Sequence, residues 1–370
     1  MTTSSTPAAP TARPAGIWLN PHARDWTSTE PASCGDFHDR LPGYAPTPLR
    51  DVPDLAEQLG VRRVLVKDES DRFGLPAFKI LGASWGVYRA LCERLGTQPE
   101  WHTVTELGDA IAPLGKPRLI TASAGNHGRA VARMARWLGL PAVILLPSTT
   151  SDGLADAIGT EGAEVRRVGD SYDEAVTTAT ELAARDERYL LVQDTSWPGY
   201  ERIPGWIRQG YQTMFREIDD QLVPDLVVVP VGVGSLLGAA LEYYRATTHP
   251  TRPSVLAVEP DTAACLLTSL HAGRPVTVPT GNTVMEGLNA GTVSATGWPT
   301  FRDGLDATVA VSDAAAIRAG ELLADKGIGV GPCGAATLAG LSAAVSAKGA
   351  REVLNLTPER RVVALGTDGR

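Results

Sequence analysis

Short apolar stretches alternate with helix-periodic stretches over most of this 370-residue chain. The runs VILLP (143–147) and LVVVPV (226–231) carry no polar side chain. Strands that are apolar throughout belong in parallel sheets that are covered on both faces. Alternation of such strands with helices is typical of βαβ units. We therefore expect an α/β protein with open, mostly parallel sheets.

The order of the expected elements supports this fold class. Expected strands cover 62–69, 119–121, 142–147, 164–168, 190–194, 226–231, 255–259 and 361–366. Expected helices cover 77–95, 127–138, 151–162, 172–185, 204–222, 236–245 and 313–326, with a small-residue helix after Gly331. The segment 96–116 has weak periodicity and is interpreted as an insertion.

Charge and cysteine content exclude several classes of function. The net charge is -8 and the isoelectric point is near 5.4, so neither nucleic acid nor an anionic membrane is an expected partner. Residues 1–15 are rich in Ser, Thr, Pro and Ala, which predicts a disordered tail and no secretion signal. No run approaches the length of a membrane span. Cys34, Cys92, Cys265 and Cys333 lack the spacing of a metal site or disulfide framework, so we expect a cytoplasmic protein without a metal.

One lysine stands out within the stretch FGLPAFKIL, residues 73–81. A strand leads into a Gly and Pro turn, and a helix follows, so Lys79 is expected in the first turn of that helix beside Phe78. The positive end of the helix and partial desolvation both disfavour a protonated lysine there. These conditions suit a lysine that forms an imine. The alternative is a solvated lysine at a helix start.

A second turn, SAGNHG (123–128), lies between an expected strand and a helix. Its glycines let backbone N–H groups approach a ligand, and the helix end favours an anion such as a substrate carboxylate. An ordinary helix cap is the alternative. The candidate substrate contacts are Ser123, Ala124, Gly125, Asn126 and His127.

Two further glycine turns follow expected strands. PVGVGSL (230–236) can form a backbone nest around a phosphate, although it lacks the spacing of a dinucleotide fold or a P-loop. GTDG (366–369) places Thr367 where it could bond a neutral ring nitrogen, or else cap the backbone. The candidate phosphate contacts are Gly232, Val233, Gly234, Ser235 and Leu236.

With these motifs, the chain resembles the fold-type II pyridoxal-phosphate enzymes, the threonine dehydratase and serine racemase group, and within it diaminopropionate ammonia-lyase. The stretches that carry the resemblance are KDESDRFGLPAFKILG (67–82), QDTSWPGYERIPGWIRQGYQTM (193–214), PVGVGSL and GPCGAATLAGL (331–341). The resemblance runs from about Asn20 to the end. It implies a fold like the tryptophan synthase β chain, with pyridoxal 5'-phosphate between a large domain (1–91 plus 195–370) and a small domain (92–194), and a homodimer.

The resemblance also implies roles for individual residues. Lys79 holds the cofactor aldehyde, with Phe78 beside the ring and Asn126 on the phenolic oxygen. Residues 232–235 hold the phosphate, and Thr367 faces the pyridine nitrogen. A hydroxyl partner makes the ring a weaker electron sink, which favours β-elimination over transamination. Asp194, in the motif QDTSW, is the base for the L substrate, and its alternative role is a helix N-cap.

Three positions depart from the family pattern. The family turn usually reads DGNHG, with an aspartate that acts on the D substrate, whereas this chain has Ala124. The family often has a cysteine that can pair with the one matching Cys265, but this chain has Ala290 there, so that disulfide cannot form. Glu286 is more reminiscent of β-replacement synthases, and is equally well explained as a solvent-exposed rim residue.

The function implied is pyridoxal-phosphate-dependent elimination of ammonia from L-2,3-diaminopropionate or a related β-substituted L-alanine, giving aminoacrylate and then pyruvate. The alternatives are β-replacement, dehydration of a hydroxy amino acid, and a homologue that binds the cofactor without catalysis. Ala124 and Glu286 leave β-replacement and dehydration open. Retention of Lys79, Asp194 and the phosphate turn argues against the last.

Overall fold

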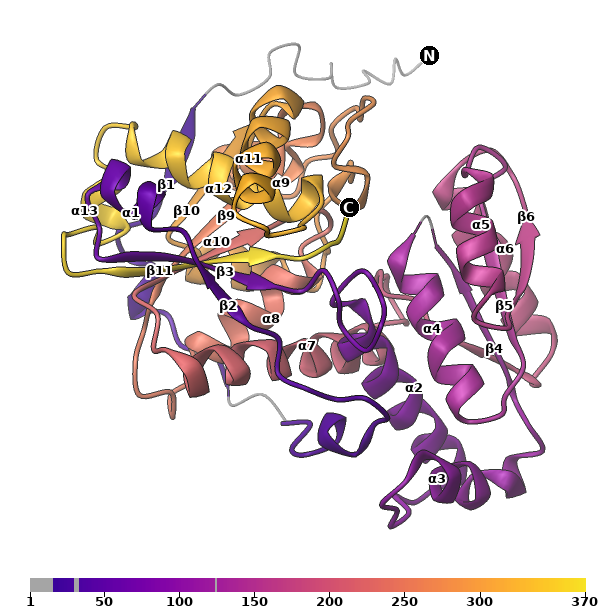
Figure 1. Cartoon of the computed structure of the whole chain (residues 1–370). Coiled ribbons are helices and arrows are strands. Elements are labelled where there is room, and N and C mark those ends of the chain that lie inside the picture. Colours follow the sequence, from indigo (N-terminus) through magenta and orange to yellow (C-terminus); the bar gives the residue numbers. More distant parts are fainter. Residues whose placement is uncertain (1–15, 30–32, 124) are drawn as a thin grey trace, which may run out of the picture.

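The computed structural model describes residues 16–29, 33–123 and 125–370 and contains two separate β-sheets (Figure 1). The larger sheet has the strand order β1-β10-β9-β8-β11-β3-β2, and its two edge strands are antiparallel to their neighbours. The smaller sheet has the order β6-β5-β4-β7 and is parallel throughout. The strands are β1 Ile17–Leu19, β2 Leu49–Asp51, β3 Arg63–Asp68, β4 Arg118–Ala122, β5 Ala142–Leu146, β6 Glu164–Arg167, β7 Tyr189–Leu191, β8 Leu226–Pro230, β9 Ser254–Pro260, β10 Ala307–Val311 and β11 Arg361–Gly366.

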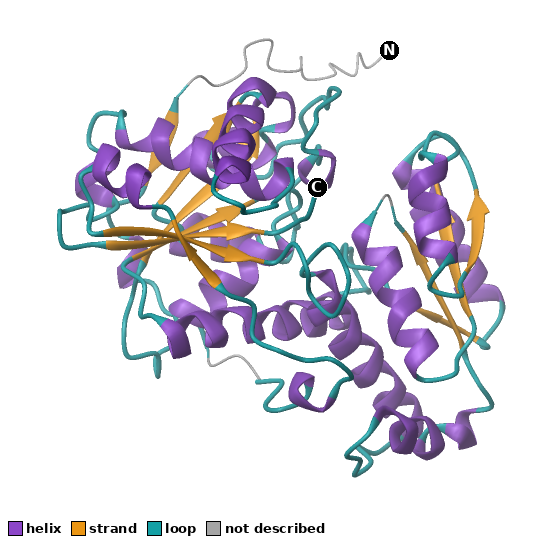
Figure 2. Ribbon diagram, in the orientation of Figure 1, coloured by secondary structure: helices purple, strands orange, loops and turns teal. Residues whose placement is uncertain are grey.

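Helices flank the strands of both sheets (Figure 2). The α-helices are α1 Pro53–Leu59, α2 Lys79–Leu95, α3 Val104–Ala110, α4 Asn126–Trp137, α5 Asp152–Gly159, α6 Tyr172–Arg185, α7 Arg202–Gln221, α8 Ser235–Tyr244, α9 Cys265–Ala272, α10 Trp298–Gly304, α11 Asp313–Asp325, α12 Pro332–Val345 and α13 Ala350–Val353. Short 3-10 helices cover Ala23–Asp25 (η1), His38–Arg40 (η2), Ala112–Leu114 (η3), Asp261–Ala263 (η4) and Glu286–Leu288 (η5).

The packing of strand β8 explains why its sequence is apolar at every position. Val227 and Val229 pack into the core that contains residues of α2, α7 and α8, whereas Leu226 and Val228 pack into the core formed with α1, α11 and α12. Successive side chains point to opposite faces of a sheet, and here both faces are buried. The expected α/β class with mostly parallel sheets is confirmed.

Helices α2 and α7 approach each other closely because glycines face the contact. A Cβ atom on Gly82 would lie 2.4 Å from Cε1 of Tyr211, and one on Gly210 would lie 2.3 Å from the carbonyl oxygen of Leu81. Any larger side chain at either position would force the helices apart. The first residue of α2, Lys79, is thereby held near Tyr211, with 6.0 Å between its Nζ atom and the centre of the tyrosine ring.

The sequence-based prediction missed several elements, among them strands β1, β2 and β10 and helices α1, α9 and α10, and two expected segments differ from the structure. The strand expected over 190–194 ends at Leu191, because the chain leaves the sheet to form the loop that carries Asp194. The segment 96–116 is not irregular, since Thr103 caps helix α3 by accepting a hydrogen bond from the backbone of Glu106.

The division into domains at residues 91/92 and 194/195 stays a prediction, and its first boundary falls inside α2. The expected tail, 1–15, lies outside the described residues. Among the helices that the structure describes, none combines the length and apolar character needed to cross a membrane.

Candidate active site

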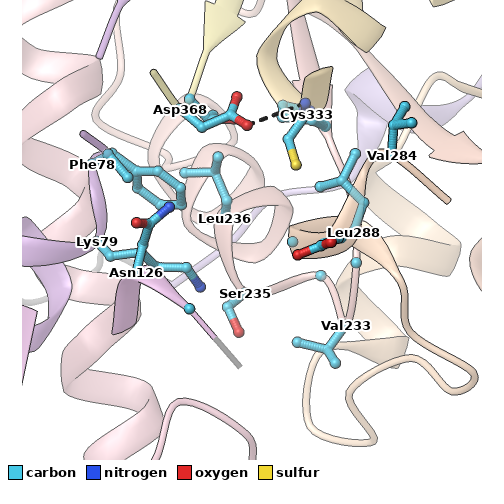
Figure 3. A pocket seen from close by; sticks show the side chains of 18 of the residues that line it. Phe78, Lys79, Asn126, Val233, Ser235, Leu236, Val284, Leu288, Cys333 and Asp368 are labelled. Atoms are coloured by element: carbon cyan, nitrogen blue, oxygen red, sulfur yellow. Dashed lines mark hydrogen bonds between the residues drawn. The ribbon is translucent and has the colours of Figure 1, made fainter. Parts of the chain in front are cut away.

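A cavity of about 280 Å³ opens where loops from both sheets meet (Figure 3). It lies beyond the carboxyl ends of β4, β8 and β11, the edge at which open α/β sheets bind ligands. Its lining includes every residue of the predicted phosphate turn, together with Phe78, Lys79, Gly125, Asn126 and Thr367. Side chains of Lys79, Asn126 and Ser235 gather on one side of this view, and Cys333 and Asp368 lie on the other.

The loop before α2 fixes the direction of Lys79. Phe73 and Gly74 both adopt positive φ, and reciprocal backbone hydrogen bonds join Arg72 and Leu75, so the chain turns sharply before the helix begins. The backbone N–H of Phe78 donates to the carbonyl of Thr367 at 3.4 Å. These contacts tie the lysine to the loop after β11. Helix α2 begins at Lys79, two residues later than expected, and Lys79 lies in its first turn as predicted.

The amine of Lys79 pairs with Asp194, with 3.0 Å between Nζ and Oδ2. Burial alone lowers the pKa of Lys79, but Tyr211 and Asp194 outweigh burial and hold that pKa above its usual value. The sequence-based expectation of a lysine whose protonated form is disfavoured is therefore wrong for this pairing. Burial alone raises the pKa of Asp194, but the charge of Lys79 and its hydrogen bond hold that pKa well below its ordinary range.

Asp194 does not cap a helix. Helix α7 starts at Arg202 and its N-cap residue is Glu201, so the alternative role of Asp194 as an N-cap is wrong. The carboxylate is instead 13% exposed and pairs with Lys79, which lines the cavity, whereas Asp194 itself is not one of the lining residues. Its backbone carbonyl accepts a hydrogen bond from the hydroxyl of Ser235 at 3.3 Å, which joins the Asp194 loop to the predicted phosphate turn.

The turn at 232–236 presents backbone N–H groups to the cavity. In the described part of the chain, none of these five N–H groups donates to another protein group. Gly234 has a φ of 100°, and a Cβ there would lie 2.5 Å from Cζ of Phe301. The turn ends at the N-terminus of α8, whose dipole adds positive potential. These features suit a phosphate that no arginine contacts.

Of the substrate contacts predicted in the SAGNHG turn, some line the cavity and others stabilise the turn itself. Gly125 and Asn126 line the cavity. The hydroxyl of Ser123 accepts from the backbone N–H groups of Gly125 (3.0 Å) and Gly128 (2.9 Å), so it stabilises the turn as a cap would. His127 is 4% exposed, and its Nε2 lies 2.8 Å from the carbonyl of Val192, away from the cavity lining. Ala124 lies outside the described residues.

Residues after β11 close another side of the cavity. Thr367 is 4% exposed, and its hydroxyl has no hydrogen-bond partner among the described residues. Asp368 accepts from the backbone N–H groups of Gly334 (2.6 Å) and Cys333 (3.2 Å) at the start of α12. Burial raises the pKa of Asp368. A Cβ on Gly334 would lie 2.6 Å from the Thr367 nitrogen, which explains the small residues of GPCGAAT.

Four residues near the site were missed from the sequence: Tyr172, Tyr211, Cys333 and Asp368. Tyr211 is fully buried, and its hydroxyl has no partner within the described ranges. The glycines of QGYQT and KILGASWG are a signal for it, since Gly210 packs against Leu81 and Gly82 where α2 meets α7. Cys333 and Asp368 each adjoin motif residues already singled out.

Glu286 lies in η5 and lines the cavity with an exposed side chain. Cys265 is a buried free thiol, as are the other three cysteines.

The structure thus brings together the amine of Lys79, the carboxylate of Asp194, the apolar ring of Phe78 and the backbone N–H groups of 232–236. The hydroxyl of Thr367, which has no partner among the described residues, lies at the same cavity. This donor set fits a cofactor with an aldehyde, an aromatic ring and a phosphate. Among the described residues, no group of three or more His, Cys, Asp or Glu side chains is placed to hold a metal.

Comparison with known proteins agrees with the site chemistry. Residues 40–368 match the family described as pyridoxal-phosphate dependent enzyme. Diaminopropionate ammonia-lyase of Salmonella typhimurium is 37% identical over 76% of this chain and 72% of its own length. The Escherichia coli K12 enzyme of the same name is 39% identical over 72% of this chain and 68% of its own. The structure of holo diaminopropionate ammonia-lyase from Escherichia coli superposes with a TM-score of 0.84 at 32% identity, covering 96% of this chain and 94% of that one. This chain therefore belongs to the pyridoxal-phosphate-dependent enzymes of the family that includes the diaminopropionate ammonia-lyases.

Proposed function

We propose that this protein eliminates ammonia from L-2,3-diaminopropionate, or from a closely related β-substituted L-alanine, to give pyruvate and ammonia. The observation that carries the proposal is the pairing of Lys79, which lines the cavity, with Asp194, whose carbonyl is bonded to Ser235 of the turn 232–236. An amine beside an ionised carboxylate supplies one group to hold an aldehyde and one to accept a proton.

The proposed roles follow from position. Lys79 would anchor the cofactor, with Phe78 beside its ring. The backbone N–H groups of 232–236 would bind the phosphate, and the side chain of Thr367 would face the ring nitrogen. When bound, pyridoxal phosphate supplies the electron sink that makes the Cα proton of an amino acid acidic.

Proton transfer is assigned to Asp194. It is ionised at neutral pH because the protonated Lys79 amine, 3.0 Å away, stabilises the carboxylate. Once the Lys79 amine is engaged by the cofactor, its charge no longer lowers the basicity of Asp194. Gly125 and Asn126, at the first turn of α4, are proposed to orient the substrate carboxylate. A positioned general base supplies about 10²- to 10⁴-fold, so the cofactor must supply the rest of the acceleration.

An absorbance scan and a product assay test the proposal together. The purified protein should absorb as a lysine imine of pyridoxal phosphate, and each molecule of L-2,3-diaminopropionate should yield one molecule of pyruvate and two of ammonia. L-serine, L-threonine and β-chloro-L-alanine complete the panel. Turnover of serine or threonine with none of diaminopropionate would replace this proposal by a dehydratase.

A β-replacement is the second candidate, because Glu286 lines the cavity from η5. In that reaction a second nucleophile captures the three-carbon unit before water does. Adding thiols or amines to the assay and looking for a new amino acid separates the two. Pyruvate formation that is unaffected by the added nucleophiles supports elimination.

We further propose the two-domain division, a cytoplasmic location and a homodimer. Four free cysteines fit a reducing compartment. Light scattering checks the dimer, with a mass near twice 39.0 kDa as the expected result.

A further inference from the structure

His127 lies next to Asp194 with one ring nitrogen unsatisfied. Its Nε2 atom is 2.8 Å from the carbonyl oxygen of Val192, which can only accept a hydrogen bond, so Nε2 carries the proton. In the neutral ring, Nδ1 therefore presents a lone pair. That atom is buried, has no hydrogen-bond partner in the described part of the chain, and lies 3.9 Å from Oδ2 of Asp194.

A bare nitrogen that faces a carboxylate is unfavourable unless a proton can come between them. Leaving a buried polar atom unpaired costs about 1–3 kcal/mol, and such exceptions in folded proteins call for an explanation. Nδ1 and Oδ2 need to approach by only about 1 Å to reach ordinary hydrogen-bond distance. Catalytic hydrogen bonds are often long before substrate binds.

We propose that His127 accepts, through Nδ1, the proton that Asp194 removes from the substrate's Cα, an inference that rests on the proposed function. The Cα–H bond breaks and its proton binds Oδ2 of Asp194. That proton then moves to Nδ1, and Asp194 returns to its ionised form. The β-ammonium group leaves as neutral ammonia, takes the proton back through Asp194 and departs as ammonium, so His127 ends neutral. His127 acts through Asp194 and is a positioning residue in this scheme.

The other titratable groups around Asp194 are less suited to receive a proton. Lys79 holds its own proton while it is paired with Asp194, since its pKa is raised, and in the proposed function its amine is then engaged by the cofactor. Tyr172 and Tyr211 stay protonated because burial raises their pKa values, that of Tyr211 to about 12. Tyr200 donates to the carbonyl of Leu191 and its pKa is likewise raised by burial. Burial lowers the pKa of His127, and although Asp194 opposes this, the ring is neutral and able to accept at neutral pH.

The first test reads protonation and needs no turnover. Nitrogen NMR of the holoenzyme with ¹⁵N-labelled histidine, assigned by loss of a signal in His127→Gln, should show His127 protonated at Nε2 and bare at Nδ1. In Asp194→Asn, the pH at which His127 gains its second proton should fall, because the neighbouring anion is gone. A proton on Nδ1 at neutral pH, or an unchanged titration in Asp194→Asn, would overturn the proposal.

The second test separates proton transfer from structure. His127→Gln retains an N–H near the position of Nε2 and so can still bond Val192, but it has no atom that gains a proton. We expect kcat to fall on the order of 10- to 100-fold with KM changed less than about twofold, and the acid limb of the kcat profile that belongs to His127 to disappear. Unchanged kcat would mean that Lys79 or solvent takes the proton.

A matched control exists in the same chain. His38 is also fully buried, with Nε2 2.9 Å from a carbonyl oxygen, but its Nδ1 is satisfied by Thr213 at 2.7 Å. His38→Gln should leave the pH profile of kcat unchanged even where it lowers the melting temperature. If no substrate is turned over, the proposed function fails. The NMR titration of His127 in the parent and in Asp194→Asn still tests whether the two side chains share a proton.

Discussion

The amine of Lys79 and the carboxylate of Asp194 lie 3.0 Å apart, although 115 positions separate them in the chain. Lys79 begins α2, which follows β3 of the larger sheet, and Asp194 follows β7 of the smaller sheet, so the pair links the segments that come after these two strands. The residue proposed to anchor the cofactor and the residue proposed to transfer the proton are therefore in direct contact.

Lys79→Ala should abolish the imine absorbance together with turnover, because the anchoring amine is gone. The measurement is an absorbance spectrum, followed by borohydride reduction and peptide mapping of the labelled lysine. Lys67 is a useful comparison, since it is fully buried but bonded to Glu217 and to the carbonyl of Thr47. A cofactor label on any lysine other than Lys79 in the parent protein would contradict the assignment.

Gly234→Val should weaken cofactor retention by roughly tenfold or more. The φ of 100° disfavours a side chain, and a Cβ would lie 2.5 Å from the Phe301 ring, so the nest must deform. Dialysis with absorbance readings gives the rate of cofactor loss. Gly205→Ala is a matched control, because a Cβ there meets nothing within 4 Å. Equal rates for Gly234→Val and the parent would place the phosphate elsewhere.

Much of this arrangement can be predicted from the sequence, because its motifs are local. The turn that carries Lys79 and the glycines at 232–234 are contiguous, so their conformations follow from short stretches. The protonation of Lys79 depends instead on Asp194, and the position of Tyr211 depends on the fit between α2 and α7. Contacts between distant segments leave no periodic signal. The four-charge cluster of Lys67, Glu69, Arg72 and Glu217 was missed for the same reason.

Glu217→Gln should lower the free energy of unfolding by about 3–5 kcal/mol at neutral pH, because it breaks a buried ion cluster. Glu217 lies 2.7 Å from both Lys67 and Arg72 and is fully enclosed. Denaturant titration measures the change. Glu181→Gln, which breaks the exposed pair with Arg185, should cost at most about 1 kcal/mol. Equal costs for the two variants would show that the cluster contributes no more than a surface pair.

Glu217 also predicts that the fold loses stability at low pH. Burial alone raises the pKa of Glu217, but Arg72 and Lys67 lower it to about 2 from an ordinary value of 4.5. A depressed pKa in the folded state stabilises the fold above pH 4.5, and this contribution is lost as the pH falls toward 2. Melting temperatures recorded from pH 6 to pH 2 (roughly the range of the carboxyl titration) should fall less steeply for Glu217→Gln than for the parent.

The last prediction concerns stereochemistry. Asp194 is proposed to serve the L substrate, and the sequence has Ala124 where the family resemblance implies an aspartate for the D substrate. Alanine cannot accept a proton, and loss of a positioned base costs on the order of 10²-fold or more. The enzyme should therefore act on L-2,3-diaminopropionate and be poor with the D isomer. Asp194→Asn should abolish the L activity, and Ala124→Asp should raise the D activity while leaving cofactor absorbance intact. Comparable pyruvate formation from both isomers by the parent protein would refute this prediction, because it would require a second base on the D face of the substrate.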